Sequence, residues 1–216
     1  LQVQGWFDQQ QISAPNMAQY LDLVALGTVA DLVPMEHNNR ILVAQGVARI
    51  RAGKARPGLL ALLSIAKRQH HNLQASDLGF SVGPRLNAAG RLDDMSLGIE
   101  CLLSDNEQIA TQLAQELDEL NAQRRHIEAD MQQQASNILA LLETSQDNQM
   151  PKCVCLYHPD WHQGVVGIVA SRIKEKWHRP ALVFAKGDAG TLKGSCRSIA
   201  GFHIRDALAA VDAQHP

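Results

Sequence analysis

The feature that most constrains the fold is an uninterrupted helical pattern that starts after residue 104 and continues to about residue 143. Ser104 and Glu107 have the spacing of a capping box, which marks the start of a helix. Apolar residues then recur in steps of three, four and seven and form one narrow stripe: Ile109, Leu113, Leu117, Leu120, Ile127, Met131, Ile138 and Leu142. At about 1.5 Å per residue, this helix would be roughly 60 Å long.

So narrow a stripe on so long a helix predicts a connector between two lobes. Arg124 and Gln134 interrupt the stripe, and Thr144 and Ser145 end it. A coiled-coil dimer, in which the stripe packs against a second copy, is the alternative.

The residues before the connector have helical patterns only. Residues 17–31 are apolar nearly all round, which predicts a buried helix that ends before Pro34. Further helices are expected after Asn38 or Asn39, from Pro57-Gly58 to Lys67, and from Asp93-Asp94 to about Leu103. In the helix after Asn38 or Asn39 we expect four apolar residues to point inward: Ile41, Leu42, Val47 and Ile50.

The residues after the connector change to an α/β pattern. A polar linker over residues 146–151 is followed by predicted strands at Cys153–Tyr157, Ala181–Ala185 and Leu192–Ser198, with helices at Gly164–Lys176 and His203–Ala213. A strand, a helix and a strand in this order imply a parallel crossover pair. Cys153 and Cys155 alternate within the first apolar run, which predicts buried thiols.

Composition limits the kinds of partner. Only 4% of the 216 residues are aromatic, so any contact with a nucleic acid should be made mainly to its backbone. The net charge of −2 argues against a generally basic surface but is compatible with a local basic groove. The four cysteines follow no disulfide pattern, which favours a reducing, cytoplasmic setting. No apolar run reaches membrane-spanning length, and the N-terminal residues do not have the pattern of a signal peptide. Because Leu1 is not a natural start residue, we expect a piece of a longer protein.

The segment Gly83–Arg91 is the strongest candidate for an anion site. It sets Arg85, Asn87 and Arg91 among glycines and alanines, with one leucine as its only large apolar residue. Small neighbours let a ligand approach the backbone, and arginine holds phosphate through paired hydrogen bonds. The alternative is a loop punctuated by glycine and proline whose arginines face water.

Asp31 is a candidate metal ligand. It lies in the apolar run Val24–Pro34, where a carboxylate is costly to bury without a partner. A divalent cation would be such a partner. The alternatives are a helix N-cap and an exposed carboxylate near a helix end.

Two further segments have residues suited to phosphate. His162, Gln163 and Gly164 follow a predicted strand and open a helix, whose first N–H groups favour anions. On the last predicted strand, alternation puts Ser195 and Arg197 on one face with Lys193, where they could follow a phosphodiester backbone. For the first segment the alternatives are an ordinary loop with surface histidines and a metal cluster of two histidines and an aspartate. For the last strand the alternative is the solvated face of an edge strand.

Four of these segments occur in a familiar order. They resemble motifs of the DHH phosphoesterase family, and within it of the exonucleases specific for single-stranded DNA. The resemblance extends over nearly the whole chain, and the segments that carry it are Ala25–Asp31, Gly83–Arg91, Trp161–Arg172 and Gly194–Ser198. The resemblance implies an α/β fold: the mostly helical end of a DHH domain, a long connecting helix, and part of a small α/β DHH-associated domain. The implied bounds are residues 1–104, 105–146 and 152–216.

The resemblance also implies roles. Asp31 would be a metal ligand, and no other catalytic residue is implied. Arg85, Asn87, Arg91, Ser195 and Arg197 would hold DNA phosphates, and residues 162–164 would open the core helix of the second lobe. The implied cofactor is Mn²⁺ or Mg²⁺, with two ions in the full-length enzyme. The implied partners are single-stranded DNA, a single-strand-binding protein and a helicase. No association with a membrane is implied.

The implied activity is hydrolysis of DNA from the 5′ end to mononucleotides, in repair and recombination. However, the family's Asp-His-His and Gly-Gly-His motifs are not in these residues, and Cys196 stands where a small residue is expected. Because two-metal hydrolysis needs several ligands, we expect the fragment alone to be inactive and its metal absent or weakly bound. The alternatives are a phosphoesterase for short oligoribonucleotides or nucleotides, and a non-catalytic single-strand binding module.

Overall fold

The computed structural model describes residues 6–7, 9–143 and 151–214. It separates into two compact units, Leu1–Asn121 and Ala122–Pro216, and the division falls inside the long helix. Among the described residues, no helix is long and apolar enough to cross a membrane.

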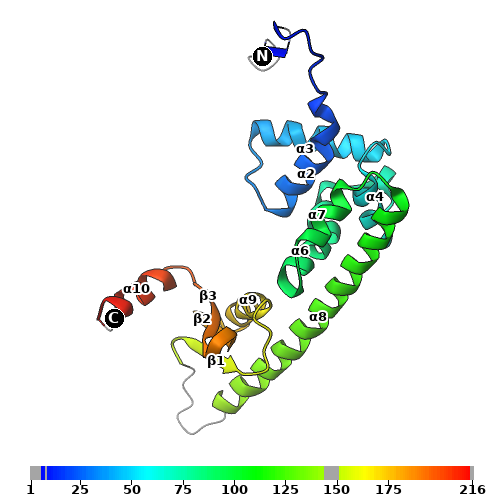
Figure 1. Ribbon diagram of the computed structural model, residues 1–216. Coiled ribbons are helices and arrows are strands. Elements are labelled where there is room, and N and C mark those ends of the chain that lie inside the picture. The colour runs from blue at the N-terminus through cyan, green and yellow to red at the C-terminus, as the bar shows by residue number, and fades with distance from the viewer. Residues whose placement is uncertain (1–5, 8, 144–150, 215–216) are drawn as a thin grey trace. The chain divides into compact units, whose positions relative to one another are not determined.

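The first unit is helical (Figure 1), as the sequence predicts. A 3₁₀ turn at Met17–Tyr20 begins at Asn16, whose side chain accepts the Ala18 N–H. Its helices are α2 (Leu21–Ala30), α3 (His37–Arg51), α4 (Pro57–Ile65), α5 (Ala75–Asp77), α6 (Gly83–Leu92), α7 (Ser96–Leu103) and the start of α8 (Glu107–Glu143). A further 3₁₀ turn, His70–Asn72, lies between α4 and α5, and a π-helical turn, Leu78–Val82, leads into α6.

The core of the first unit combines residues from most of its helices. Leu26, Ile50, Leu62, Leu78 and Leu117 are among its buried members. The helices α2 and α3 pack closely because Gly46 has no side chain: a Cβ there would lie 2.2 Å from the Leu21 carbonyl oxygen.

The inward face of α3 differs in part from the prediction. Val47 and Ile50 are buried as predicted, but Ile41 and Leu42 are 48% and 38% exposed, and Val43 is buried in their place. The stripe that packs on α2 therefore begins at Val43 and continues through Gly46, Val47 and Ile50 at helical spacing.

The long helix α8 confirms the strongest prediction, and its bounds differ from the predicted ones by only a few residues. Leu117 is buried in the core of the first unit, whereas Met131 and Leu139 are buried in the half of α8 that belongs to the second unit. The stripe is therefore used within one chain, which removes the reason to expect a coiled-coil dimer.

The second unit contains a three-stranded sheet in the order β1-β2-β3. β1 (Val154–His158) and β2 (Ala181–Lys186) are parallel and are joined by α9 (Val166–Trp177), which confirms the predicted crossover. β3 (Leu192–Arg197) is antiparallel to β2, a 3₁₀ turn at Asp188–Gly190 joins them, and α10 (Ile204–Gln214) follows.

The predicted burial of two thiols is wrong. Val154 and Leu156 are buried on the same face of β1, so Cys155 points to the opposite face and is exposed. Cys153 is only partly buried. Periodicity predicted the alternation of the strand, but both faces would have to be covered for the thiols to be buried.

Side-chain contacts fix the second half of α8 within its unit. The buried Trp161 donates its indole N–H to Gln134 Oε1 at 2.8 Å. Glu128 accepts from Arg124 Nη1 at 2.7 Å, and its other oxygen lies 3.4 Å from Arg172 Nε on α9. Gln134, an interruption of the apolar stripe in the sequence, is thus the partner of an anchoring tryptophan.

Candidate functional site

The segment Gly83–Arg91 is helical, so the loop alternative is wrong. Pro84 lies in the first turn of α6, where its missing N–H costs nothing. Packing does not require glycine at either position: a Cβ on Gly83 would lie at an ordinary contact distance of 3.4 Å from Ala30 Cβ, and one on Gly90 would lie 2.7 Å from Cε of the flexible Met95 side chain. Helical spacing puts Asn87 and Arg91 on one exposed face of α6, four residues apart.

Arg85 points elsewhere, because it lies two residues from Asn87 and so on a different side of the helix. Its Nε lies 2.8 Å from Asp118 Oδ1 on α8, and its Nη1 donates to the Ser81 carbonyl oxygen at 2.5 Å. The side chain is only 16% exposed. The charge of this guanidinium is therefore largely neutralised by a carboxylate of the same unit.

Asp31 directly follows α2 and is exposed. The buried carboxylate of this region is instead Asp22, which is 0% exposed and accepts the Arg56 backbone N–H at 2.8 Å. Sequence reasoning had no signal for that bond, because its donor lies 34 residues away. The metal role of Asp31 stays a prediction.

Packing brings the end of α2, which precedes Asp31, close to the start of α6. Cβ atoms on Gly79 and Gly83 would lie 3.3 Å from Val29 Cγ1 and 3.4 Å from Ala30 Cβ, and Asp31 is the next residue of the chain. Two segments separated by about fifty residues are thus neighbours in the first unit. However, no group of three or more His, Cys, Asp or Glu side chains suited to a metal ion occurs among the described residues.

The loop from His162 to Gly164 lies between β1 and α9, as predicted. His162 Nδ1 accepts the Gly164 N–H at 3.1 Å, so that N–H is already used within the loop. Gln163 is exposed. The described residues do not form the alternative metal cluster here, because His158 and His162 gather no third ligand around a shared point.

The second unit brings Ser195 and Arg197 into direct contact. Arg197 Nη1 donates to Ser195 Oγ at 2.9 Å, and Nε donates to Ser171 Oγ on α9 at 2.7 Å. Gly167 of α9 makes room for this pair, because a Cβ there would lie 3.1 Å from both Arg197 Nη2 and Ser195 Oγ. Ser171 is a residue that sequence reasoning missed, because its role appears only when α9 packs on β3.

The face of β3 that carries these residues is the face next to α9. Ser195 pairs with Val183 and Arg197 with Ala181, and both of those partners on β2 are buried. Ser195 and Arg197 are consequently half-buried, while Lys193 further along the strand is exposed. β3 is an edge strand, but this part of it is not the fully solvated face that the alternative required.

The charge of Arg197 is not neutralised. Its partners are two hydroxyls and the Cys196 carbonyl oxygen, and no ion pair with a carboxylate is found for it among the described residues. Hydroxyl and carbonyl oxygens fix the orientation of the guanidinium without cancelling its charge. Such a group is oriented in advance for an anion.

Comparison with known proteins gives consistent matches. Residues 150–216 match the model of the DHHA1 domain. The whole chain is 59% identical over 216 residues to the single-stranded-DNA-specific exonuclease RecJ of Escherichia coli K12, and 34% identical over 191 residues to that of Bacillus subtilis 168. The chain spans 37% of the length of the first of these relatives and 24% of the second.

Solved structures agree with the sequence matches. RecJ of Thermus thermophilus in complex with Mg²⁺ is 34% identical, with a TM-score of 0.78 over 96% of this chain and 30% of that one. The Mn²⁺ complex of the same protein gives a TM-score of 0.77, with 96% of this chain and 29% of that one covered. The helical unit, the long helix and the small mixed sheet therefore match part of the RecJ fold.

Proposed function

We propose that this chain, a RecJ homologue that includes a DHHA1 domain, is part of a metal-dependent 5′–3′ exonuclease that degrades single-stranded DNA to mononucleotides. The observation that supports this most strongly is the cluster of Ser195, Arg197 and Ser171. It presents a fixed guanidinium without a neutralising carboxylate, beside the Ser195 hydroxyl, which can donate to a phosphate oxygen.

We assign the first unit, with residues 1–104 as its DHH part, to the metal-proximal side. Asp31 would be one ligand of Mn²⁺ or Mg²⁺, and the two-ion arrangement would need ligands beyond it. The described residues alone do not fit a two-metal centre, because they contain no group of three or more side chains suited to a metal ion. We therefore propose that the 216 residues alone do not hydrolyse DNA.

We assign DNA binding to residues of both units. Asn87 and Arg91 are on the exposed face of α6, where they would contact phosphates. Arg85 uses Nε and Nη1 for its contacts with Asp118 and Ser81. Its remaining nitrogen, Nη2, would contact a phosphate. Residues 162–164 would contribute polar groups beside α9.

We place the enzyme in the cytoplasm, in DNA repair and recombination, with a single-strand-binding protein and a helicase as partners. Four free cysteines support a reducing setting. The domain bounds proposed from the sequence, 1–104, 105–146 and 152–216, are to be tested by limited proteolysis.

The test is digestion by the full-length protein with Mn²⁺ or Mg²⁺. The substrates are a long single-stranded oligonucleotide, the same strand in a blunt duplex, and a dinucleotide. We expect mononucleotides to be released from the 5′ end of the long single strand, with far slower digestion of the other two. Preference for the dinucleotide would favour a phosphoesterase of short substrates, and binding without hydrolysis would favour a non-catalytic module.

A further inference from the structure

One face of α9 is aligned with β3 beyond the cluster already described. Gly167, Ser171, Lys174 and His178 follow one another in steps of four, three and four, so they lie along a single face of the helix. The first two of these residues contact Ser195 and Arg197. The other two continue the same face to the end of the helix, where His178 is the C-cap.

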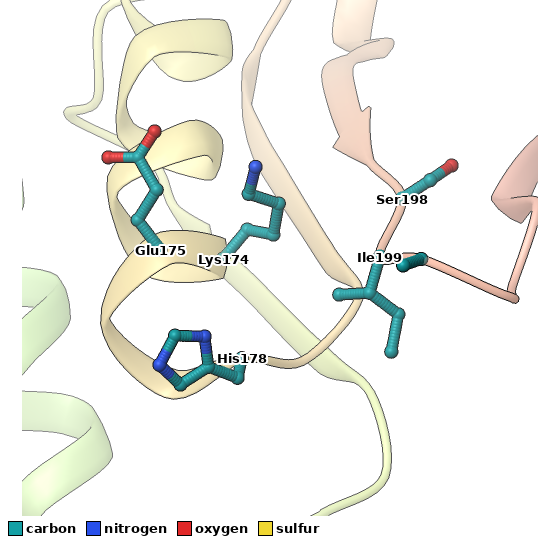
Figure 2. A pocket seen from close by; sticks show the side chains of 6 residues that line it. Lys174, Glu175, His178, Ser198 and Ile199 are labelled. Carbon is teal, nitrogen blue, oxygen red and sulfur yellow. The ribbon is translucent and has the colours of Figure 1, made fainter.

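A cavity of about 450 Å³ lies at that end, between α9 and the segment that follows β3. Figure 2 shows Lys174 between Glu175 and the segment that carries Ser198 and Ile199. The lining residues are Lys174, Glu175, His178, Ser198, Ile199 and Ala200. Lys174 is one helical turn beyond Ser171 on α9, so this side of the cavity continues the line of polar groups that begins at Ser195 and Arg197, whereas the Ser198 hydroxyl points away from Lys174 (Figure 2).

The charges in this cavity favour an anion. The Lys174 ammonium forms no ion pair or hydrogen bond among the described residues. The one carboxylate of the lining, that of Glu175, lies 3.4 Å from Arg172 Nη1. Ser198 Oγ accepts the Ile204 N–H at 3.1 Å, which leaves the hydroxyl hydrogen available to donate.

We propose that Lys174 binds the backbone phosphate next to the one held by Ser195 and Arg197, so that a single strand follows the α9–β3 seam. We define this seam as Gly167, Ser171, Lys174, Ser195 and Arg197. The inference rests on the proposed function and extends its binding track by one nucleotide. Ile199 and Ala200 give an apolar wall for the sugar that joins the two phosphates.

The first test measures binding of oligothymidylate to the full-length protein as a function of salt, without divalent metal. Lys174→Gln should weaken binding about three- to tenfold and lower the salt slope by about 0.7, the value for one phosphate contact on a single strand. Lys174→Arg should restore most of the loss. Lys176→Gln is the matched control, because Lys176 Nζ lies 4.4 Å from the Trp177 ring centroid, outside the cavity. Equal effects of the Lys174→Gln and Lys176→Gln variants would overturn the proposal.

The second test identifies the phosphate. A single neutral methylphosphonate is moved stepwise along the oligonucleotide, and binding is measured with the wild type, Arg197→Gln and Lys174→Gln. In each variant, we expect the methylphosphonate to stop weakening binding at one position, namely that of the phosphate bound by the replaced residue. We expect the positions found with the two variants to be adjacent. If Lys174→Gln responds to the methylphosphonate like the wild type while Arg197→Gln still identifies one position, the phosphate contact of Lys174 is wrong but the proposed function stands. No single-strand binding by the wild type would remove the proposed function as well.

Discussion

Two arginines predicted to hold phosphate occur in different electrostatic settings. Arg85 of the first unit is paired with Asp118 at 2.8 Å, whereas Arg197 of the second unit is held by the hydroxyls of Ser171 and Ser195. Both guanidinium groups are oriented by their neighbours. Only Arg197 keeps its full charge for a ligand, so the seam should contribute more to DNA affinity than Arg85 does.

The largest contrast between the two units should be in thiol reactivity. Burial raises the pKa of Cys101, in the core of the first unit, to about 11, from 9.0. Its thiolate fraction at pH 8 is consequently about a hundredfold lower than that of an unburied thiol. Iodoacetamide labelling followed by mass spectrometry should modify the exposed Cys155 and leave Cys101 unmodified, and Cys101 labelling should accelerate as the pH rises towards about 11. Equal labelling at pH 8 would contradict the closed core.

A smaller effect is expected from Gly167→Ala. The new methyl group would lie 3.1 Å from both Arg197 Nη2 and Ser195 Oγ, so the guanidinium must shift by a few tenths of an ångström. We expect single-strand affinity to fall about fivefold, or about 1 kcal/mol. The unfolding midpoint should stay level or rise, because alanine favours a helix over glycine. Unaltered affinity with a lower midpoint would assign Gly167 to packing alone.

The smallest effects should come from Arg85 and its partner. Arg85→Ala should weaken binding by about twofold and reduce the salt slope by less than one contact, since Asp118 already neutralises most of that charge. Asp118→Asn should tighten binding by a similar factor, because it releases the guanidinium. If the salt slope of Arg85→Ala equals that of the wild type, Arg85 makes no phosphate contact.

Most of the fold could be predicted from the spacing of apolar residues, because that spacing indicates which side of each helix or strand is buried. The long helix α8 was predicted from an apolar stripe with helical spacing, and the three strands from short apolar runs. The exposure of Cys155 and Ile41 was not predicted, because burial depends on which element covers each face. The segment from Gly83 to Arg91 was open to a loop interpretation, because glycine and proline are common in loops, but Pro84 lies in the first turn of a helix, which proline also suits.

The candidate site was predicted only in its residue types. Arg85, Ser195 and Arg197 could be selected because guanidinium and hydroxyl groups suit phosphate. Their partners, Asp118 and Ser171, lie 33 and 26 residues away from Arg85 and Arg197, and no local pattern links such positions. Charge neutralisation of one arginine and not the other is therefore a property of tertiary packing.

A crystal structure of the full-length protein with a single-stranded oligonucleotide tests the central claim most directly. The account predicts one backbone phosphate within hydrogen-bonding distance of Arg197 and Ser195, and the adjacent phosphate within reach of Lys174 Nζ. A strand that passes elsewhere, with Arg197 still bonded only to Ser171 and Ser195, would contradict it.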